Sequence, residues 1–149
     1  MTTDSADLYF RRVTATRNEP VSLAQGMFPA TAGDLPLWAI ETAPQVSALT
    51  RLPHNWNGYN SVPPSKETAA RAIRLLTLIG SHAQHPPLVS ATGDQSILLE
   101  WHRGNDYLAI EVPAPQLPMS YFALTASGET EADLPEDSLG QVLGQFFGH

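Results

Sequence analysis

The chain has 149 residues, a formal net charge of −7, and eight Lys and Arg residues against fifteen Asp and Glu. A surface of this charge repels nucleic acid and anionic lipid, so neither a nucleic acid nor a membrane partner is expected. The chain contains no cysteine, which excludes disulfides and cysteine-bound metals and is compatible with a cytoplasmic location. No apolar run approaches the roughly 20 residues of a membrane-spanning helix, and the acidic N-terminus is unlike a secretory signal.

The length predicts one domain over residues 1–149, with an N-terminal strand and arm at 1–50 and a helix–meander–helix core at 51–149. Residues 8–15 have strand propensity, and residues 16–36 form an irregular arm rich in Pro and Gly. This composition predicts a loop or an arm laid over the domain.

Apolar side chains interrupt the end of this arm, namely Leu35, Leu37 and Trp38. They are candidates either to anchor the arm or to bind a partner protein. The sequence predicts a short helix at 37–43, with a further helical turn or two at 46–52. Pro44 is expected to end or kink the first of these, because proline lacks the backbone N–H that a helix interior needs.

A helix is predicted from Lys66 to Ile79, because its apolar residues recur every three or four positions. Ser65 is placed to cap the N-terminus of this helix, and Glu67 lies in its first turn. Gly80 follows directly, in the position typical of a C-terminal cap.

The following segment predicts strands at 88–92, 97–103, 106–112 and 119–125, then an exposed acidic turn at 126–133. Gly104-Asn105 suits a two-residue type II′ hairpin turn, which pairs Arg103 with Asp106 and Leu99 with Ile110. In that register one face of the hairpin is entirely apolar and the other is mostly polar, whereas a slip of one residue would mix them. A final helix is expected to begin at Pro135.

These elements predict an α+β fold, with an antiparallel sheet of three to four strands packed on one face by two helices, and an irregular Pro-rich N-terminal arm. The apolar face of the hairpin is then explained by its packing against these helices in the core. Any function of the hairpin falls to its polar face.

That polar face carries Glu100, His102, Tyr107 and Glu111. Two carboxylates beside an imidazole are suited to acid–base chemistry, and with His54 they make the candidate set for a small hydrolase or a metal-dependent enzyme. The alternative is an ordinary solvated sheet face, which is favoured because the sequence places no nucleophile beside them. No catalytic residue is therefore assigned.

A turn rich in amides and aromatic rings precedes the helix, consisting of Asn55, Trp56, Asn57, Gly58 and Tyr59. Trp56 and Tyr59 are candidate partner-binding residues, and Asn55 and Asn57 are candidate polar contacts. The competing interpretation gives Trp56 to the core and leaves Asn57-Gly58 only to turn the chain.

Two histidines with an acidic residue, His82, His85 and Asp94, are a candidate zinc site. Nothing in their spacing fixes a third ligand, so a polar connector is the preferred interpretation. No metal and no cofactor are expected.

The Asn55–Tyr59 turn, the Pro63-Pro64-Ser65 helix start and the Leu99-Glu100-Trp101 strand together resemble a group of small uncharacterised bacterial proteins. That group shares an Asn-Trp-Asp/Asn-Gly turn, a Pro-Ser-capped helix and a Leu-Glu-Trp strand. The resemblance spans residues 52–124 and implies an accessory role, such as an antitoxin, immunity or defence-associated protein. This chain has Asn57 where the group most often has Asp, so it lacks any catalytic carboxylate at that position.

The leading functional hypothesis is a non-enzymatic protein that acts by direct contact with another protein, with a basic toxin or nuclease as the expected partner. The first alternative is the enzyme built on His54, Glu100, His102 and Glu111. The second is an oligomeric regulator, for example a homodimer, that associates through its exposed sheet face.

Overall fold

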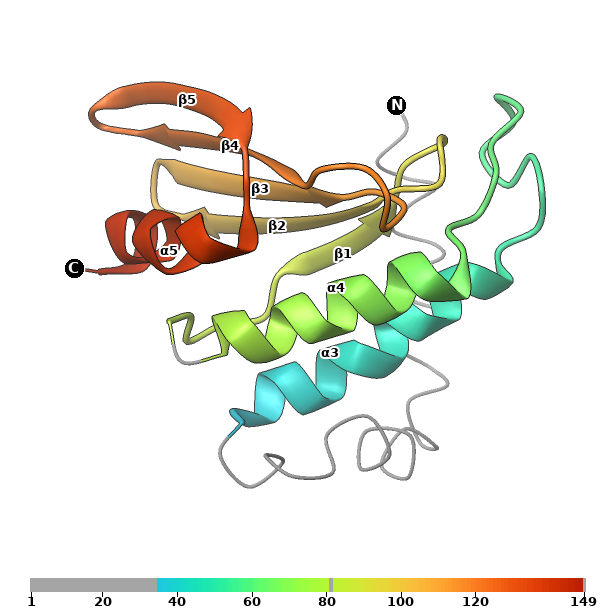
Figure 1. Ribbon diagram of the computed structural model, residues 1–149, viewed down its shortest axis with the longest axis horizontal. Coiled ribbons are helices and arrows are strands. Elements are labelled where there is room, and N and C mark those ends of the chain that lie inside the picture. Colours follow the sequence, from blue (N-terminus) through green and yellow to red (C-terminus); the bar gives the residue numbers. More distant parts are fainter. Residues whose placement is uncertain (1–34, 81, 149) are drawn as a thin grey trace.

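The computed structural model describes residues 35–80 and 82–148 (Figure 1). The predicted strand at 8–15 and most of the predicted arm at 16–36 lie outside these residues. The elements follow one another in this order: α3 (Leu37–Ala48), the 3-10 turn η2 (Leu49–Arg51), α4 (Lys66–Ile79), β1 (Leu88–Ala91), β2 (Ile97–Arg103), β3 (Asp106–Val112), β4 (Ser120–Thr125), β5 (Gly128–Asp133), the 3-10 turn η3 (Glu136–Ser138) and α5 (Leu139–Phe147).

The predicted α+β class is confirmed, and the sheet is a five-stranded antiparallel meander in the order β1-β2-β3-β4-β5. The predicted hairpin register is also confirmed, because Arg103 pairs with Asp106 and Leu99 pairs with Ile110. Gly104 has a φ of +63°, as the first central residue of a II′ turn requires. The turn and the alternation of apolar residues therefore set the same register.

Strand β5 corrects the prediction of three to four strands, because residues 128–133 form a fifth strand and not an acidic turn. All six of its residues are exposed. Its backbone pairs with β4 along its whole length, from Thr125↔Gly128 to Ser120↔Asp133. An edge strand that buries no side chain lacks the apolar alternation from which a strand is recognised.

Helix α4 has the predicted bounds and the predicted cap. The Ser65 hydroxyl accepts a hydrogen bond from the Thr68 backbone N–H at 3.1 Å. Gly80 ends the helix with φ −48°, so it is not in the left-handed conformation that usually selects glycine there. A Cβ at Gly80 would lie 3.1 Å from Cδ of Pro36, so glycine permits the close approach of this proline.

Helix α3 corrects the prediction of a short helix that spans only 37–43, because the α-helix runs from Leu37 to Ala48 with Pro44 inside it. Beyond the proline, Val46 and Ala48 are buried in the core. We attribute the continuation to this burial against α4, which outweighs the hydrogen bond that proline cannot donate.

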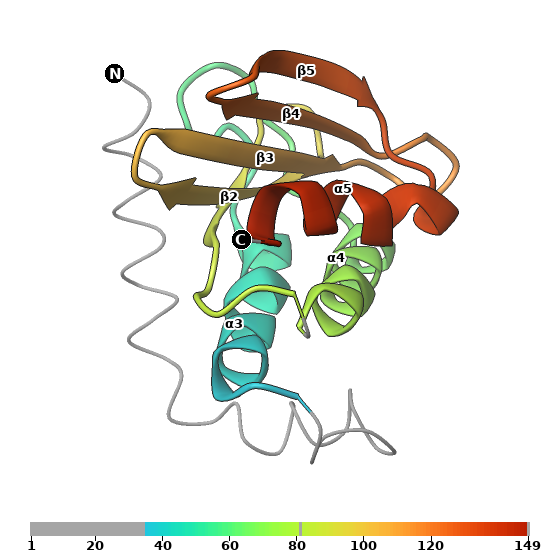
Figure 2. The same ribbon diagram turned by 90° about the vertical axis from the view of Figure 1, so that its left-hand side faces the viewer.

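The three helices of the described residues, α3, α4 and α5, lie on one side of the sheet (Figure 2). The core between them and the sheet takes the apolar face of the hairpin, in which Ile97, Leu99, Leu108, Ile110 and Val112 are fully buried. Helix α5 contributes the buried side chains Leu139, Leu143 and Phe146. The predicted packing by two helices is therefore extended by a third, because α3 also contributes to the core.

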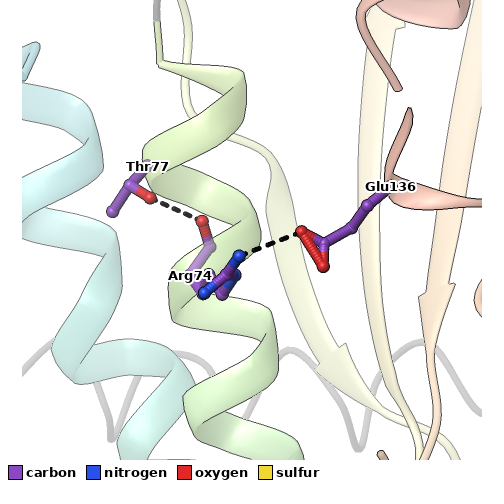
Figure 3. A network of polar contacts seen from close by, with 3 residues as sticks. All are labelled: Arg74, Thr77 and Glu136. Atoms are coloured by element: carbon purple, nitrogen blue, oxygen red, sulfur yellow. Dashed lines mark hydrogen bonds and ion pairs between the residues drawn. The ribbon is translucent and has the colours of Figure 1, made fainter. Parts of the chain in front are cut away.

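An ion pair joins α4 to the segment that leads into α5. Nη2 of Arg74 lies 3.2 Å from Oε1 of Glu136, and the Thr77 hydroxyl donates to the Arg74 carbonyl at 2.6 Å (Figure 3). Both charged side chains are more than half exposed. An exposed pair of this kind contributes about 0–1 kcal/mol.

Candidate functional site

The candidate site is the sheet face that points away from the helices, which we call the outer face. Within the described part of the chain, no helix packs on it (Figure 2). Because side chains alternate along a strand, the register assigns its members, which are Leu88, Ser90, Leu98, Glu100, His102, Tyr107, Ala109, Glu111, Ser120, Phe122, Leu124, Glu129, Glu131 and Asp133.

The middle of the outer face is aromatic and apolar. The Tyr107 ring lies between His102 and Phe122, with ring centroids 4.8 Å and 6.0 Å apart respectively. Leu124, which pairs with Tyr107, is 37% exposed. The phenol of Tyr107 donates a hydrogen bond to the Glu100 carboxylate. These contacts across β2, β3 and β4 hold the side chains in place.

Carboxylates flank this middle, namely Glu100, Glu111, Glu129, Glu131 and Asp133. No strand position on the outer face of the described sheet carries Lys or Arg. Arg103 belongs to the opposite face, where its guanidinium lies 5.5 Å from the centre of the Phe146 ring. It also reaches Asp106 at 3.8 Å, which is the pair predicted at the hairpin neck. The outer face is consequently acidic without internal compensation.

The predicted polar-face residues Glu100, His102, Tyr107 and Glu111 all lie on the outer face, but His54 does not join them. His54 is in the loop before the Asn55–Tyr59 turn and makes no hydrogen bond, ion pair or ring contact with the other described residues. The turn is attached near the start of β2 through the Val62↔Asp94 bridge, at the end of the sheet opposite Gly104 (Figure 1). Three of the four candidate residues of the enzyme hypothesis therefore share a face, and His54 is not brought to them.

The asparagines of the turn use their side chains to fold it. Oδ1 of Asn57 accepts from the Tyr59 N–H at 2.8 Å, and Oδ1 of Asn55 accepts from the Asn60 N–H at 2.7 Å. Asn55 and Asn60 both have a φ of +62°, a conformation that asparagine tolerates better than most residues. An aspartate at position 57 would accept the same hydrogen bond, so the exchange of Asn for Asp is explained without catalysis.

The residues predicted to bind a partner differ in exposure. Trp38 is only 8% exposed and donates from Nε1 to the Ala83 carbonyl at 3.0 Å, so its ring belongs to the core. Trp56 is half-buried and packs against the same core. Leu35 is half-buried, whereas Leu37 and Tyr59 are 68% and 78% exposed. Only Leu37 and Tyr59 offer most of their side chains to a partner.

Sequence reasoning missed the contribution of β5 to this face. Glu129, Glu131 and Asp133 occupy every second position of β5 and project on the same side as Glu100. The alternation of acidic residues with Thr130 and Ala132 has the period of a strand. The alternation of charged side chains was therefore the available signal, although β5 carries no large apolar side chain that would mark it as a strand.

Within residues 35–80 and 82–148, no three His, Cys, Asp or Glu side chains gather where they could hold a metal ion, which leaves the His82, His85 and Asp94 set without a site. Among the described helices, none has the length and apolarity needed to cross a membrane. In comparisons with known proteins, no family model matches the chain, and no curated protein or solved structure is significantly similar to it.

The Tyr107 phenol makes the stability of the fold depend on pH in the alkaline range. Burial, reinforced by the hydrogen bond to Glu100 and by that carboxylate's charge, raises the pKa of Tyr107 well above its usual value. Below the usual tyrosine pKa of about 10, the phenol is protonated in both the folded and the unfolded chain. The stability that the protonated phenol contributes to the fold is then fully present. Above it, the unfolded chain ionises first, so stability falls as the pH rises toward the folded pKa.

We therefore expect the Tyr107→Phe variant to lose less stability than the wild type when the pH is raised beyond about 10. Urea unfolding followed by circular dichroism at several alkaline pH values measures this difference. Glu100→Gln removes the hydrogen-bonded carboxylate but leaves the burial of Tyr107 unchanged. The loss of stability of this variant with rising pH should therefore be intermediate between those of the wild type and Tyr107→Phe. Equal slopes for the wild type and Tyr107→Phe would contradict the assignment.

Proposed function

We propose that this protein is a non-enzymatic binding protein whose outer face contacts the basic surface of a partner protein. The observation that carries the proposal is the composition of that face. Its aromatic and apolar middle is flanked by five carboxylates, and none of its strand positions carries Lys or Arg. An antitoxin- or immunity-like role stays a prediction within this proposal, with a basic toxin or nuclease as the partner.

The layout of the outer face resembles that of a protein interface. Phe122 is half-buried and Leu124 is 37% exposed, so apolar surface is available on β4, next to Tyr107, whereas Leu88, which is 52% exposed, lies on the edge strand β1. Interfaces generally place apolar and aromatic groups centrally and polar groups at the rim. Carboxylates at such a rim accelerate encounter with a basic partner and reject acidic ones.

The charge of the outer face also favours a different protein over a second copy of this chain. A two-fold symmetric contact places each patch against its own copy. Here it would bring carboxylates such as Glu129 and Glu131 against carboxylates, and like charges in an interface are destabilising. We therefore prefer a basic partner to the oligomeric regulator.

The hydrolase alternative receives less support from the same geometry. Glu100 accepts the Tyr107 hydroxyl, His102 lies against the Tyr107 ring, and His54 is on a separate loop. A general base needs access to a substrate proton and an adjacent reacting group. No observation places such a group beside these side chains.

Site-specific photo-crosslinking in the native host tests the proposal. The photoreactive amino acid p-benzoylphenylalanine is placed at Leu124 on the outer face or, as a matched control, at Ala70, which is exposed on α4. We expect a crosslinked adduct with a basic protein from position 124 only, with a yield that falls as salt screens the carboxylates. Mass spectrometry of the adduct identifies the partner.

Binding of the purified partner then supplies the decisive comparison. Glu131→Lys reverses a charge on the exposed edge strand, and the affinity should fall because two positive surfaces are brought together. The proposal fails if no adduct is specific to position 124, if the partner is acidic, or if Glu131→Lys leaves its affinity unchanged.

A further inference from the structure

A cleft opens at one end of the outer face, where β2 begins, β3 ends and β4 begins. Its volume is about 440 Å³. Glu111 and Ser120, both outer-face residues, contribute to its lining, so the cleft is continuous with that face. The segments before β2 and after β3 supply the other walls.

The polar lining of the cleft is acidic. Asp94 and Glu111 both line it, and no Lys or Arg is among its lining residues. Asp94 accepts a hydrogen bond from the Thr92 hydroxyl, which orients its carboxylate. The Glu111 side chain makes no hydrogen bond or ion pair with another described residue, so its carboxylate is available to a ligand.

Ser96 adds an independent indication that the cleft takes a polar ligand. Its residue is only 4% exposed, yet it lines the cleft. Its backbone N–H and carbonyl both bond to Thr92, whereas its hydroxyl makes no hydrogen bond with the described residues. Within the described residues this oxygen is not fully buried, so its hydrogen-bond partner has to come from whatever occupies the cleft. A donor that entered the cleft would supply that partner.

The remaining wall is apolar and firmly held. Pro113, Leu117 and Pro118 line it, and Leu117 is 52% exposed. Nη1 of Arg71 donates to the carbonyls of Pro113, Ala114 and Leu117 at 3.2, 2.9 and 2.7 Å, so helix α4 holds this loop in place. A wall fixed in advance reduces the entropy that binding must overcome.

From this geometry we infer that the cleft binds the side chain of an arginine on the partner protein. The inference rests on the proposed function and specifies the chemistry of its anchor. The aliphatic stem of the arginine packs on Leu117 and the prolines, while its guanidinium donates to Asp94, Glu111 and the Ser96 hydroxyl. Arginine suits the cleft better than lysine because its planar fork presents five donors to several separate acceptors.

An NMR titration with a minimal probe tests this assignment on the full chain. The probe is N-acetyl-arginine methylamide, and the matched control is N-acetyl-citrulline methylamide, which has nearly the same shape but no charge. We expect saturable shifts of the Ser96 and Gln116 amide signals with the arginine probe and none with citrulline. Glu111→Gln should weaken the probe by about tenfold, the equivalent of about 1.4 kcal/mol.

Glu129→Gln is the matched control variant, because it removes an outer-face carboxylate from β5, which does not line the cleft. Its affinity for the probe should stay within about twofold of the wild type, as expected for an exposed charge outside the site. Asp94→Asn provides a second test of the cleft if Glu111→Gln does not fold, as judged from its amide spectrum.

The inference is overturned by citrulline binding as well as arginine, by the absence of saturation, or by equal effects of Glu111→Gln and Glu129→Gln. A calcium chloride titration that shifts the same signals while the arginine probe does not would also overturn it. These failures differ from failure of the proposed function, which is judged from the adduct at position 124. If the adduct at position 124 still forms, but Glu111→Gln and Asp94→Asn bind the partner protein as tightly as the wild type does, only the arginine assignment is lost.

Discussion

Replacing Trp101 with alanine should lower the free energy of unfolding by about 3–5 kcal/mol. Trp101 is 4% exposed and lies in β2 opposite Leu108. Its Nε1 donates to the His85 carbonyl at 3.0 Å, and its ring makes an edge-on contact with Phe147 at 5.7 Å. The ring therefore connects the sheet to the segment before β1 and to α5, and its removal leaves a cavity among all three. Urea unfolding followed by circular dichroism measures the loss.

The next residue provides the control for Trp101. His102 is exposed on the outer face, so His102→Ala should cost less than about 1 kcal/mol even though it loses the contact with the Tyr107 ring. Trp101→Phe keeps a ring in the core but removes the bond to His85, and its cost should be about 1–2 kcal/mol. If Trp101→Ala were no more harmful than His102→Ala, the tryptophan would not be part of the core.

This comparison separates the roles within the Leu99-Glu100-Trp101 motif. Leu99 and Trp101 are buried, whereas Glu100 points to the outer face and accepts the Tyr107 hydroxyl. A motif of this kind is therefore mostly a requirement of the fold. Only its middle residue lies on the outer face, so the resemblance carried by the motif says more about structure than about function.

The hairpin and helix α4 could be predicted because their signals are local. The Gly104-Asn105 turn fixes a register that apolar alternation independently confirms, and the Ser65 cap adjoins the periodic segment that it starts. Pro44 misled the prediction of α3 for the opposite reason. Its local preference is real, but the packing of Val46 in the core, among residues distant in sequence, outweighs it.

The outer face could be predicted only in part. The hairpin register placed Glu100, His102, Tyr107 and Glu111 together, but the acidic residues of β5 join them only after β4 and β5 pair. The cleft could not be predicted from the sequence. Its walls come from segments on either side of the hairpin, and its loop is held by Arg71, more than 40 residues earlier in the chain. Contacts between residues so far apart in the chain do not alter the local sequence pattern from which helices and strands are predicted.

Arg71 and Arg74 offer a test of that long-range contact, since they lie one turn apart on α4 and differ in their partners. Arg71→Ala should lower the free energy of unfolding by about 2 kcal/mol, because a charged donor to the carbonyls of Pro113, Ala114 and Leu117 is lost. Arg74→Ala removes only the exposed pair with Glu136 (Figure 3) and should cost less than about 1 kcal/mol. Urea unfolding of both variants provides the comparison.

Hydrogen exchange adds a local measure of the same contact. The Leu117 N–H donates to the Ala114 carbonyl at 2.9 Å inside the loop that Arg71 holds. Its exchange should accelerate in Arg71→Ala and stay at the wild-type rate in Arg74→Ala, since only the first substitution frees the loop. Equal stabilities and equal exchange rates in the two variants would show that Arg71 does not hold the loop. The wall of the cleft formed by residues 113–118 would then not be fixed before a ligand binds, and the arginine probe should bind both variants with equal affinity.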